Sequence, residues 1–109
     1  MATQASARRQ FQDVFSEVIV YTAAFNPGNA ATGNGTFSST DITVPGAALG
    51  DFVMVSFGLD PVDTYVCGAV TAANVVTVTV LNNTVAGVDL GSATVRICVL
   101  KANPAVFYL

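Results

Sequence analysis

The stretch Val75-Val-Thr-Val-Thr-Val-Leu81 has the clearest pattern in the chain and decides its fold class. The valines at positions 76, 78 and 80 alternate with Thr77 and Thr79, so the two sets of side chains would point to opposite faces of a β-strand. Valine and threonine are also β-branched, which favours strands over helices. We therefore expect a strand here, with the valines on one face and the threonines on the other.

Similar stretches occur on both sides of this strand. A last strand over residues 93–100 would bury Val95, Ile97 and Val99. Further strands are expected over residues 18–23, 36–44, 52–57 and 64–70, with glycine, proline and asparagine between them. These short segments leave no room for helical crossovers. The sequence thus predicts an all-β chain, an antiparallel β-sandwich or barrel of jelly-roll or Greek-key type, with a short N-terminal helix or arm.

The domain is expected over residues 17–101, between two segments of different character. In residues 1–16, Phe11, Val14 and Phe15 fall with Val18 at the i, i+3, i+4, i+7 spacing of an apolar helical stripe. This segment would be a short helix packed on its own domain, an arm that reaches a neighbouring subunit, or disordered. Residues 102–109 form an apolar tail after Pro104, which would dock in the core of its own domain or on a neighbour.

Two details of the strand pattern lead to specific expectations. Phe37 and Ile42 are five residues apart, an odd spacing that cannot place both on one face, so we expect a bulge near Ser38 and Ser39. The strands over 18–23, 52–57 and 64–70 carry apolar residues on both faces. A sheet that faces water on one side usually alternates with polar residues. The second face is therefore expected to be covered, plausibly by another subunit.

The composition of the chain favours contact with other proteins. Among 109 residues, 52% are hydrophobic and only 10% are charged, against about 25% charged in an average soluble domain. A domain of this size leaves much of its surface in water, because small domains have a high ratio of surface to volume. With so few charged side chains, large apolar areas must remain at the surface, and such areas usually mark contact sites.

Membranes and nucleic acids are less suited to this sequence. The longest apolar stretches, such as 18–25, have about eight residues, whereas a spanning helix needs about 20. Arg8 and Arg9 are not followed by the apolar run of a secretory signal, so we expect synthesis in a cytoplasm. The net charge of −3 argues against a nucleic-acid-binding surface. In a reducing compartment Cys67 and Cys98 would be buried free thiols, although a disulfide between them stays open.

Little catalytic chemistry can be built from this sequence. The chain has no histidine, which excludes Ser-His and Cys-His dyads and His-containing zinc sites. Asp60 and Asp63 flank a Pro-Val turn, but they lack the alternating oxygen ligands of a calcium loop, so we interpret them as turn residues. We expect no enzyme activity, no metal and no cofactor.

The runs 42–56, 68–80 and 91–99 resemble small all-β phage virion proteins in the style of their strands and turns. Head decoration (cement) proteins are the most similar group, followed by fibre and knob proteins. The resemblance covers residues 36–101 and leaves out the two terminal segments. It implies a homo-oligomer, a trimer in such groups, that sits on the exterior of a capsid and holds neighbouring major capsid proteins together.

The leading hypothesis is therefore a structural virion protein, a capsid decoration protein that oligomerises and bridges major capsid subunits. The alternative is a phage tail, fibre or head-knob module that binds host surface glycans. A small ligand-binding barrel would need convergent polar groups in a pocket, and the strands offer mainly valine, alanine and threonine. The expected partner contacts lie in the two terminal segments: Arg8, Phe11, Phe15, Val106, Phe107, Tyr108 and Leu109.

Overall fold

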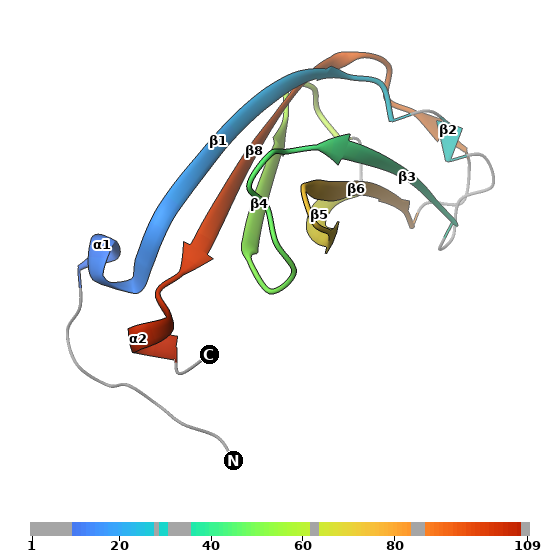
Figure 1. Cartoon of the computed structure of the whole chain (residues 1–109). Helices are drawn as coiled ribbons and strands as arrows, with labels where there is room; N and C mark the ends of the chain where they lie inside the picture. Colours follow the sequence, from blue (N-terminus) through green and yellow to red (C-terminus); the bar gives the residue numbers. More distant parts are fainter. Residues whose placement is uncertain (1–9, 28, 31–35, 62–63, 84–86, 108–109) are drawn as a thin grey trace.

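The computed structural model describes residues 10–27, 29–30, 36–61, 64–83 and 87–107, and it is almost entirely β (Figure 1). Two short helices lie near the chain ends, α1 (Phe11–Val14) and α2 (Pro104–Phe107). The strands between them are β1 (Phe15–Phe25), β2 (Asn29–Ala30), β3 (Thr36–Thr43), β4 (Phe52–Phe57), β5 (Thr64–Ala72), β6 (Val75–Asn82), β7 (Val88–Asp89) and β8 (Ala93–Ala102).

The strands form two antiparallel three-stranded sheets that face each other, so the chain is a sandwich and not a closed barrel. One sheet has the order β1-β8-β4, and we name it the terminal sheet because it carries both helices at one end. The other has the order β3-β6-β5, and we name it the central sheet. The strands β2 and β7 form a separate two-stranded ribbon. The expected all-β sandwich with a short N-terminal helix is confirmed.

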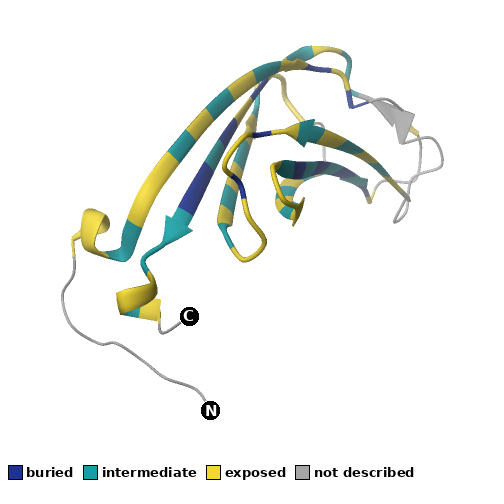
Figure 2. Cartoon of the chain, viewed as in Figure 1, coloured by how far each residue is buried: buried dark blue, intermediate teal, exposed yellow. Residues whose placement is uncertain are grey.

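The core lies between the inner faces of the two sheets, and the predicted alternation places it correctly. In β6, Val76 and Val78 are fully buried and face the core, while Thr77 and Thr79 face outward. In β8, Val95, Ile97 and Val99 are buried as predicted, and the inward residues of the neighbouring strands pack around them. Figure 2 shows this alternation as dark and light bands along the strands.

The two sheets approach most closely where β5 passes β4, because Gly68 has no side chain. A Cβ atom added at Gly68 would lie 2.5 Å from Cγ2 of Val55 and 3.3 Å from Cγ1 of Val53, both on β4. Contacts as short as the first do not occur in folded proteins, so glycine is required here for close packing of the backbone. This contact fixes which face of each sheet is inner and which is outer.

The loop between β3 and β4 covers the inner face of the terminal sheet beyond the central sheet. Gly46 adopts a left-handed φ of +95°, and a Cβ there would lie 2.9 Å from Cδ1 of Ile19. Asn74, at the β5–β6 turn, holds this loop through its backbone carbonyl to the Val44 N–H (2.8 Å) and its side-chain Oδ1 to the Gly46 N–H (2.9 Å). The loop therefore closes the core at that end.

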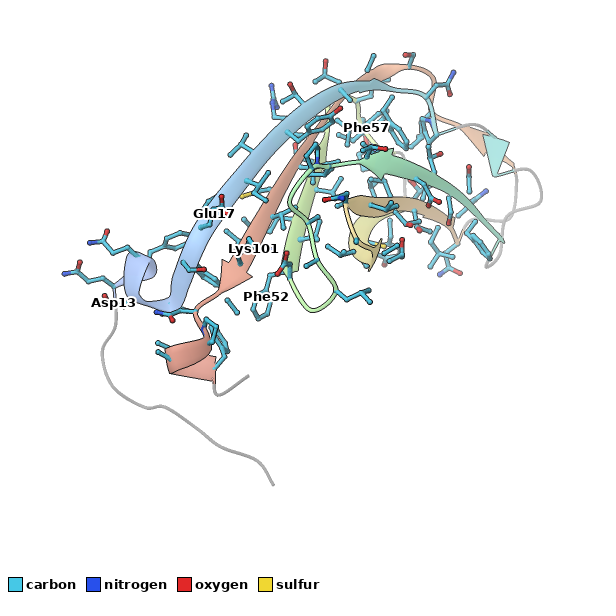
Figure 3. The ribbon with its side chains drawn as sticks, in the orientation of Figure 1. Asp13, Glu17, Phe52, Phe57 and Lys101 are labelled. Atoms are coloured by element: carbon cyan, nitrogen blue, oxygen red, sulfur yellow. The ribbon has the colours of Figure 1, made fainter. Side chains whose placement is uncertain are left out.

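Lys101 pins the same loop to the terminal sheet. Its Nζ donates to Oδ2 of Asp51 at 2.6 Å and to the Gly46 carbonyl at 3.0 Å. Figure 3 shows Lys101 on β8, with Phe57 further along the sheet toward the core. With the loop held in this way, it covers the inner face of the terminal sheet around Ile19, while Glu17, nearer the helices, is exposed on that face.

Two expectations about local structure are wrong. The helix α1 ends at Val14, and Phe15 begins β1, so Phe15 and Val18 belong to a strand and not to a helical stripe. Pairing of this segment with β8 overrides its helical periodicity, because the ten-residue ladder satisfies its backbone groups. The strand β3 also has no bulge: its register with β6 is continuous from Thr36 to Thr43, and Phe37 points outward while Ile42 faces the core.

The shape is elongated, with extents of 46 × 28 × 23 Å and a radius of gyration of 16.1 Å, against about 13 Å for a compact domain of this length. The pair β1–β8 accounts for this shape, because it is longer than the central sheet and extends past it toward α1 and α2 (Figure 1). The end of the terminal sheet that carries the helices therefore stands clear of the sandwich.

Candidate interaction surface

The outer face of the terminal sheet is apolar and exposed, and we name it the apolar face. The register of the ladders places its side chains in rows across β1, β8 and β4. Val20, Cys98 and Met54 form the middle row, in which the exposed fractions of Val20 and Met54 are 73% and 57%. The rows on either side are Val18, Leu100 and Phe52 toward the helices, and Thr22, Arg96 and Ser56 away from them.

This face arises because β1, β4 and β8 carry apolar residues at both odd and even positions. In β4, Val53 and Val55 pack into the core, and the intervening Phe52 and Met54 point outward. Exposed single apolar side chains are common, but a contiguous group of them usually marks a contact site. The strands over 18–23 and 52–57 were expected to carry apolar residues on both faces, and in the terminal sheet they do.

Four phenylalanine rings gather at the helical end of the apolar face, and we name them the terminal aromatic cluster. Phe15 lies 4.9 Å from Phe11, 5.7 Å from Phe52 and 6.3 Å from Phe107, measured between ring centroids. Phe52 and Phe107 are 5.7 Å apart. These separations lie in the range in which aromatic pairs attract each other. Figure 3 labels Phe52 at the end of β4 nearest α2.

Hydrogen bonds from Asn103 hold the two helices beside each other under this cluster. The Asn103 N–H donates to the Val14 carbonyl, and its side-chain Nδ2 donates to the Asp13 carbonyl, both at 2.9 Å. Its Oδ1 accepts from the Ala105 N–H at 3.1 Å, which caps the start of α2. A single asparagine therefore fixes the position of Phe107 relative to Phe11 and Phe15.

An open hollow of about 320 Å³ lies beside the cluster, over the middle row of the apolar face. Its lining is almost entirely apolar, and Val20, Met54 and Cys98 contribute to it together with Arg96 at the row beyond. Leu100, one row closer to the helices, is buried outside the main core, next to Val18 and Phe52. The face thus has an aromatic end beside the helices and a hollowed end over the rows of Cys98 and Arg96.

Charged side chains are sparse around this face. Among the residues that the structure describes, no carboxylate is paired with Arg96, which is exposed on the hollowed end. Asp13 is exposed on α1, at the aromatic end. The ion pair of Lys101 and Asp51 lies on the inner side and belongs to the loop contact described above.

The structure brings three of the predicted contact residues together. Phe11, Phe15 and Phe107 are all members of the terminal aromatic cluster, and Val106 is half-buried in α2 beside them. The tail had two expected docking places, its own core or a neighbour. Phe107 instead packs on its own chain but outside the core, and it stays partly exposed. Three predicted contact residues lie outside the described residues: Arg8, Tyr108 and Leu109.

The sequence interpretation did not single out the middle row. Val20 and Met54 belong to strands whose two-sided apolar character was recognised, but no site was derived from it. Cys98 belongs to the strand over 93–100, for which no second apolar face was predicted. The signal was present in the run 52–57, where every residue but Ser56 is apolar. The expected burial of Cys67 is wrong: it is exposed on the outer face of the central sheet, whereas Cys98 is half-buried on the opposite side of the sandwich. Both thiols are free.

The outer face of the central sheet is different, and we name it the hydroxyl face. Ser39 Oγ and Thr79 Oγ1 lie 3.0 Å apart, Thr77 Oγ1 donates to Asp41 Oδ1 at 2.7 Å, and Thr71 Oγ1 lies 2.7 Å from Thr77 Oγ1. At one end of this face a further row holds Phe37, Leu81 and Tyr65.

Neither face holds recognisable reactive chemistry. Within residues 10–27, 29–30, 36–61, 64–83 and 87–107, no three His, Cys, Asp or Glu side chains come close enough to hold a metal ion. No helix in the same part of the chain is long and apolar enough to cross a membrane.

Comparison with known proteins adds no relative. No protein-family model, curated protein or solved structure matches the chain.

Proposed function

We propose that this chain is a structural protein of a virus particle, a decoration protein that self-associates and bridges major capsid subunits on the exterior of a phage head. The observation that carries the proposal is the apolar face of the terminal sheet, with Val20, Met54 and Phe52 exposed in adjacent rows. The strand-and-turn resemblance of residues 36–101 supplies the class of particle, and a trimer is the oligomer that it implies.

The energetics of the apolar face favour a protein partner. Monomeric soluble proteins seldom expose contiguous apolar patches of more than a few hundred Å². Burial of such surface stabilises a contact by about 25 cal/mol per Å². Because charged residues make up only 10% of the chain, little in its composition opposes this burial. A surface of this kind gains free energy wherever a complementary apolar surface is supplied.

Free strand edges provide a second way to join subunits. Within the described residues, β1 pairs with β8 on one side only, and β4 likewise lies at the edge of the terminal sheet. An edge strand presents unpaired N–H and C=O groups to which another strand can be added. In a particle with many copies, a modest free energy per contact is sufficient, because the contacts act together.

The side-chain composition also suits a structural role better than a catalytic one. The chain has no histidine and only four lysine and arginine residues, and Lys101 is committed to Asp51. General acid–base and nucleophilic catalysis usually require groups that this sequence does not offer.

The proposal is tested with heads of the encoding phage that have been assembled without this protein. Purified wild-type chain is added, and bound copies per head and the temperature of head disruption are measured. We expect saturable binding and a higher disruption temperature. The Phe52→Lys variant should bind at least tenfold more weakly, and at the same protein concentration it should raise the disruption temperature less. A Tyr65→Lys variant, which changes a more exposed ring on the hydroxyl face (65% against 46% for Phe52), is the control. Heads that bind no protein at micromolar concentration would refute the decoration role.

A second candidate, a glycan-binding module of a tail or fibre, is favoured by one observation. Phe37 and Tyr65 flank Leu81 in one row of the central sheet and are about equally exposed, at 66% and 65%. Two flat rings beside the hydroxyls of Ser39 and Thr79 form a surface on which a sugar ring can stack. Binding to a glycan array that is lost in Phe37→Ala and Tyr65→Ala, but kept in Met54→Ala, would support this candidate over the first.

A further inference from the structure

The apolar face is complementary to itself, and we propose that it binds the apolar face of a second copy of this chain in a twofold, face-to-face contact. In this contact the terminal aromatic cluster of each copy lies in the hollow of the other. This inference rests on the self-association in the proposed function. It adds to it by naming the surface and the partner.

Shape is the first argument for a second copy. The helical end of the face carries the terminal aromatic cluster, where Phe11 and Phe52 are exposed. The open hollow of about 320 Å³ lies over the middle row and reaches Arg96 in the row beyond. A twofold axis between the cluster and the hollow exchanges them, so that the cluster of each copy meets the hollow of the other. An isologous contact of this kind uses the same patch on both copies and closes on a pair, so it gives a dimer and not the trimer that the resemblance implies.

Charge is the second argument. Arg96 borders the hollow, and no described carboxylate of its own chain pairs with it. Asp13 is exposed on α1, at the aromatic end. The rotation that exchanges the two ends brings Arg96 of one copy to the helical end of the other, where both the Asp13 carboxylate and the phenylalanine rings would attract a guanidinium group. The same rotation places Asp13 of the first copy beside Arg96 of the second, so the pair forms twice.

Area is the third argument. Three strands about 4.8 Å apart and the three rows about 6.8 Å apart make a flat rectangle of about 300 Å². The terminal aromatic cluster extends the face beyond these rows, and a standard protein interface buries about 800 Å² per partner. The apolar face therefore suits a pair at the small end of the range of interfaces, and its centre is apolar with polar residues such as Thr22 and Ser56 at its margin, as interfaces commonly are.

The two cysteines allow a direct test, because Cys98 lies in the hollow and Cys67 lies on the hydroxyl face. In full-length chain, the rate of maleimide labelling is measured for each thiol over a range of protein concentrations. We expect labelling of Cys98 to slow at least tenfold as the pair forms, and labelling of Cys67 to change less than twofold. Protection of Cys98 that does not depend on concentration would mean that the chain covers its own face, and it would overturn the proposal.

Engineered cross-linking identifies the partner residue. A chain with Cys67→Ala and Phe11→Cys is oxidised, and we expect a disulfide between Cys98 of one copy and position 11 of the other, visible as a band of two chain masses. A chain with Cys98→Ala and Phe11→Cys, in which Cys67 remains, is the control and should give no such band. Equal yields from both would contradict the contact.

Lysine substitutions separate this inference from the broader proposed function. In light scattering, Val20→Lys and Met54→Lys are expected to weaken self-association at least tenfold, whereas Phe37→Lys and Tyr65→Lys, on the edge strands of the other sheet, should change it less than twofold. If the wild-type chain self-associates but the first two variants do so equally well, this contact is wrong while self-association stands. If the wild-type chain remains a monomer at millimolar concentration, the self-association in the proposed function fails with it.

Discussion

The two outer faces of this sandwich have the same geometry and opposite chemistry. Each belongs to a three-stranded antiparallel sheet whose inner side packs into one shared core. On the central sheet, outward threonine and serine hydroxyls are bonded to one another and to Asp41. On the terminal sheet, the corresponding positions hold Val20, Cys98 and Met54. The backbone does not distinguish the two faces, so the difference lies in the side chains. The proposed self-association would cover the apolar face, and the following substitutions test how the two faces differ.

The largest change in the free energy of unfolding is expected where the two sheets pack against each other. This contact also determines which face of each sheet points outward. A Gly68→Val substitution would drive a side chain into Val53 and Val55, and we expect it to lower the free energy of unfolding by about 3 kcal/mol. Urea denaturation followed by circular dichroism measures this. The neighbouring Ala69→Val, which points outward, is the control and should change stability by less than about 0.5 kcal/mol. Equal losses in both variants would contradict the assigned faces.

A smaller effect is expected at Asn74, which holds the loop that covers the inner side of the terminal sheet. Asn74 has a left-handed φ of +64°, and its Oδ1 accepts the Gly46 N–H. We expect Asn74→Ala to cost about 2 kcal/mol, from about 1 for the backbone and about 1 for the hydrogen bond. Asn74→Gly removes only the second contribution and should cost about 1 kcal/mol. If the two variants unfold at the same urea concentration, the backbone conformation contributes nothing.

The ion pair on the same loop should contribute less, because it is partly open to solvent. Asp51 Oδ2 accepts from Lys101 Nζ at 2.6 Å and from the Ala48 N–H at 2.9 Å, and the Lys101 side chain is 25% exposed. We expect Asp51→Asn to lower stability by about 1 kcal/mol after allowance for screening. The loss relative to wild type should shrink in 1 M NaCl. An undiminished loss at high salt would assign the effect to the Ala48 hydrogen bond instead.

The smallest effect on stability, and the most direct test of the comparison, comes from making the hydroxyl face apolar. The double variant Thr77→Val and Thr79→Val removes the outward hydroxyls of β6. We expect stability to change by about 0.5 kcal/mol or less, because these hydroxyls are near solvent. Fluorescence of a hydrophobic dye should rise, since the face then resembles the apolar one. Ser39→Ala, which removes a hydroxyl without adding methyl groups, should leave the dye signal unchanged; a rise there would undermine the interpretation.

The parts of the fold that follow from the sequence are those that depend on alternation within one strand. Val76 and Val78 in β6 were predicted to share one face, and Ile97 in β8 was predicted to be buried; all three are buried on the inner side, and the bounds of β4 agree with the prediction. In these strands the period of two coincides with one buried face, so local pattern and tertiary packing give the same answer.

The predictions failed for apolar residues that lie on an outer face of the sandwich. Phe37 was assumed to face the core like Ile42, which required a bulge; it lies outward in a regular ladder. Phe15 was assigned to a helix because its spacing fits one, but it pairs with Ala102, which is 87 positions away in the chain. A partner so distant leaves no mark on local periodicity. For the same reason the meeting of Phe52 with Phe107 in the terminal aromatic cluster could not be derived from either segment alone.

The position of Asn103 has a consequence for the topology of the chain as a polymer. Because Asn103 donates to the carbonyls of Asp13 and Val14, the backbone after β8 returns to the segment just before β1. A short linker between α1 and α2 would make the part of the chain between the two helices cyclic. Such a ring encloses nearly the whole sandwich. Closing a loop of this length removes more conformational freedom from the unfolded chain than any short cross-link. A cyclised form should therefore withstand heating better than the linear one, while the order of its strands is unchanged.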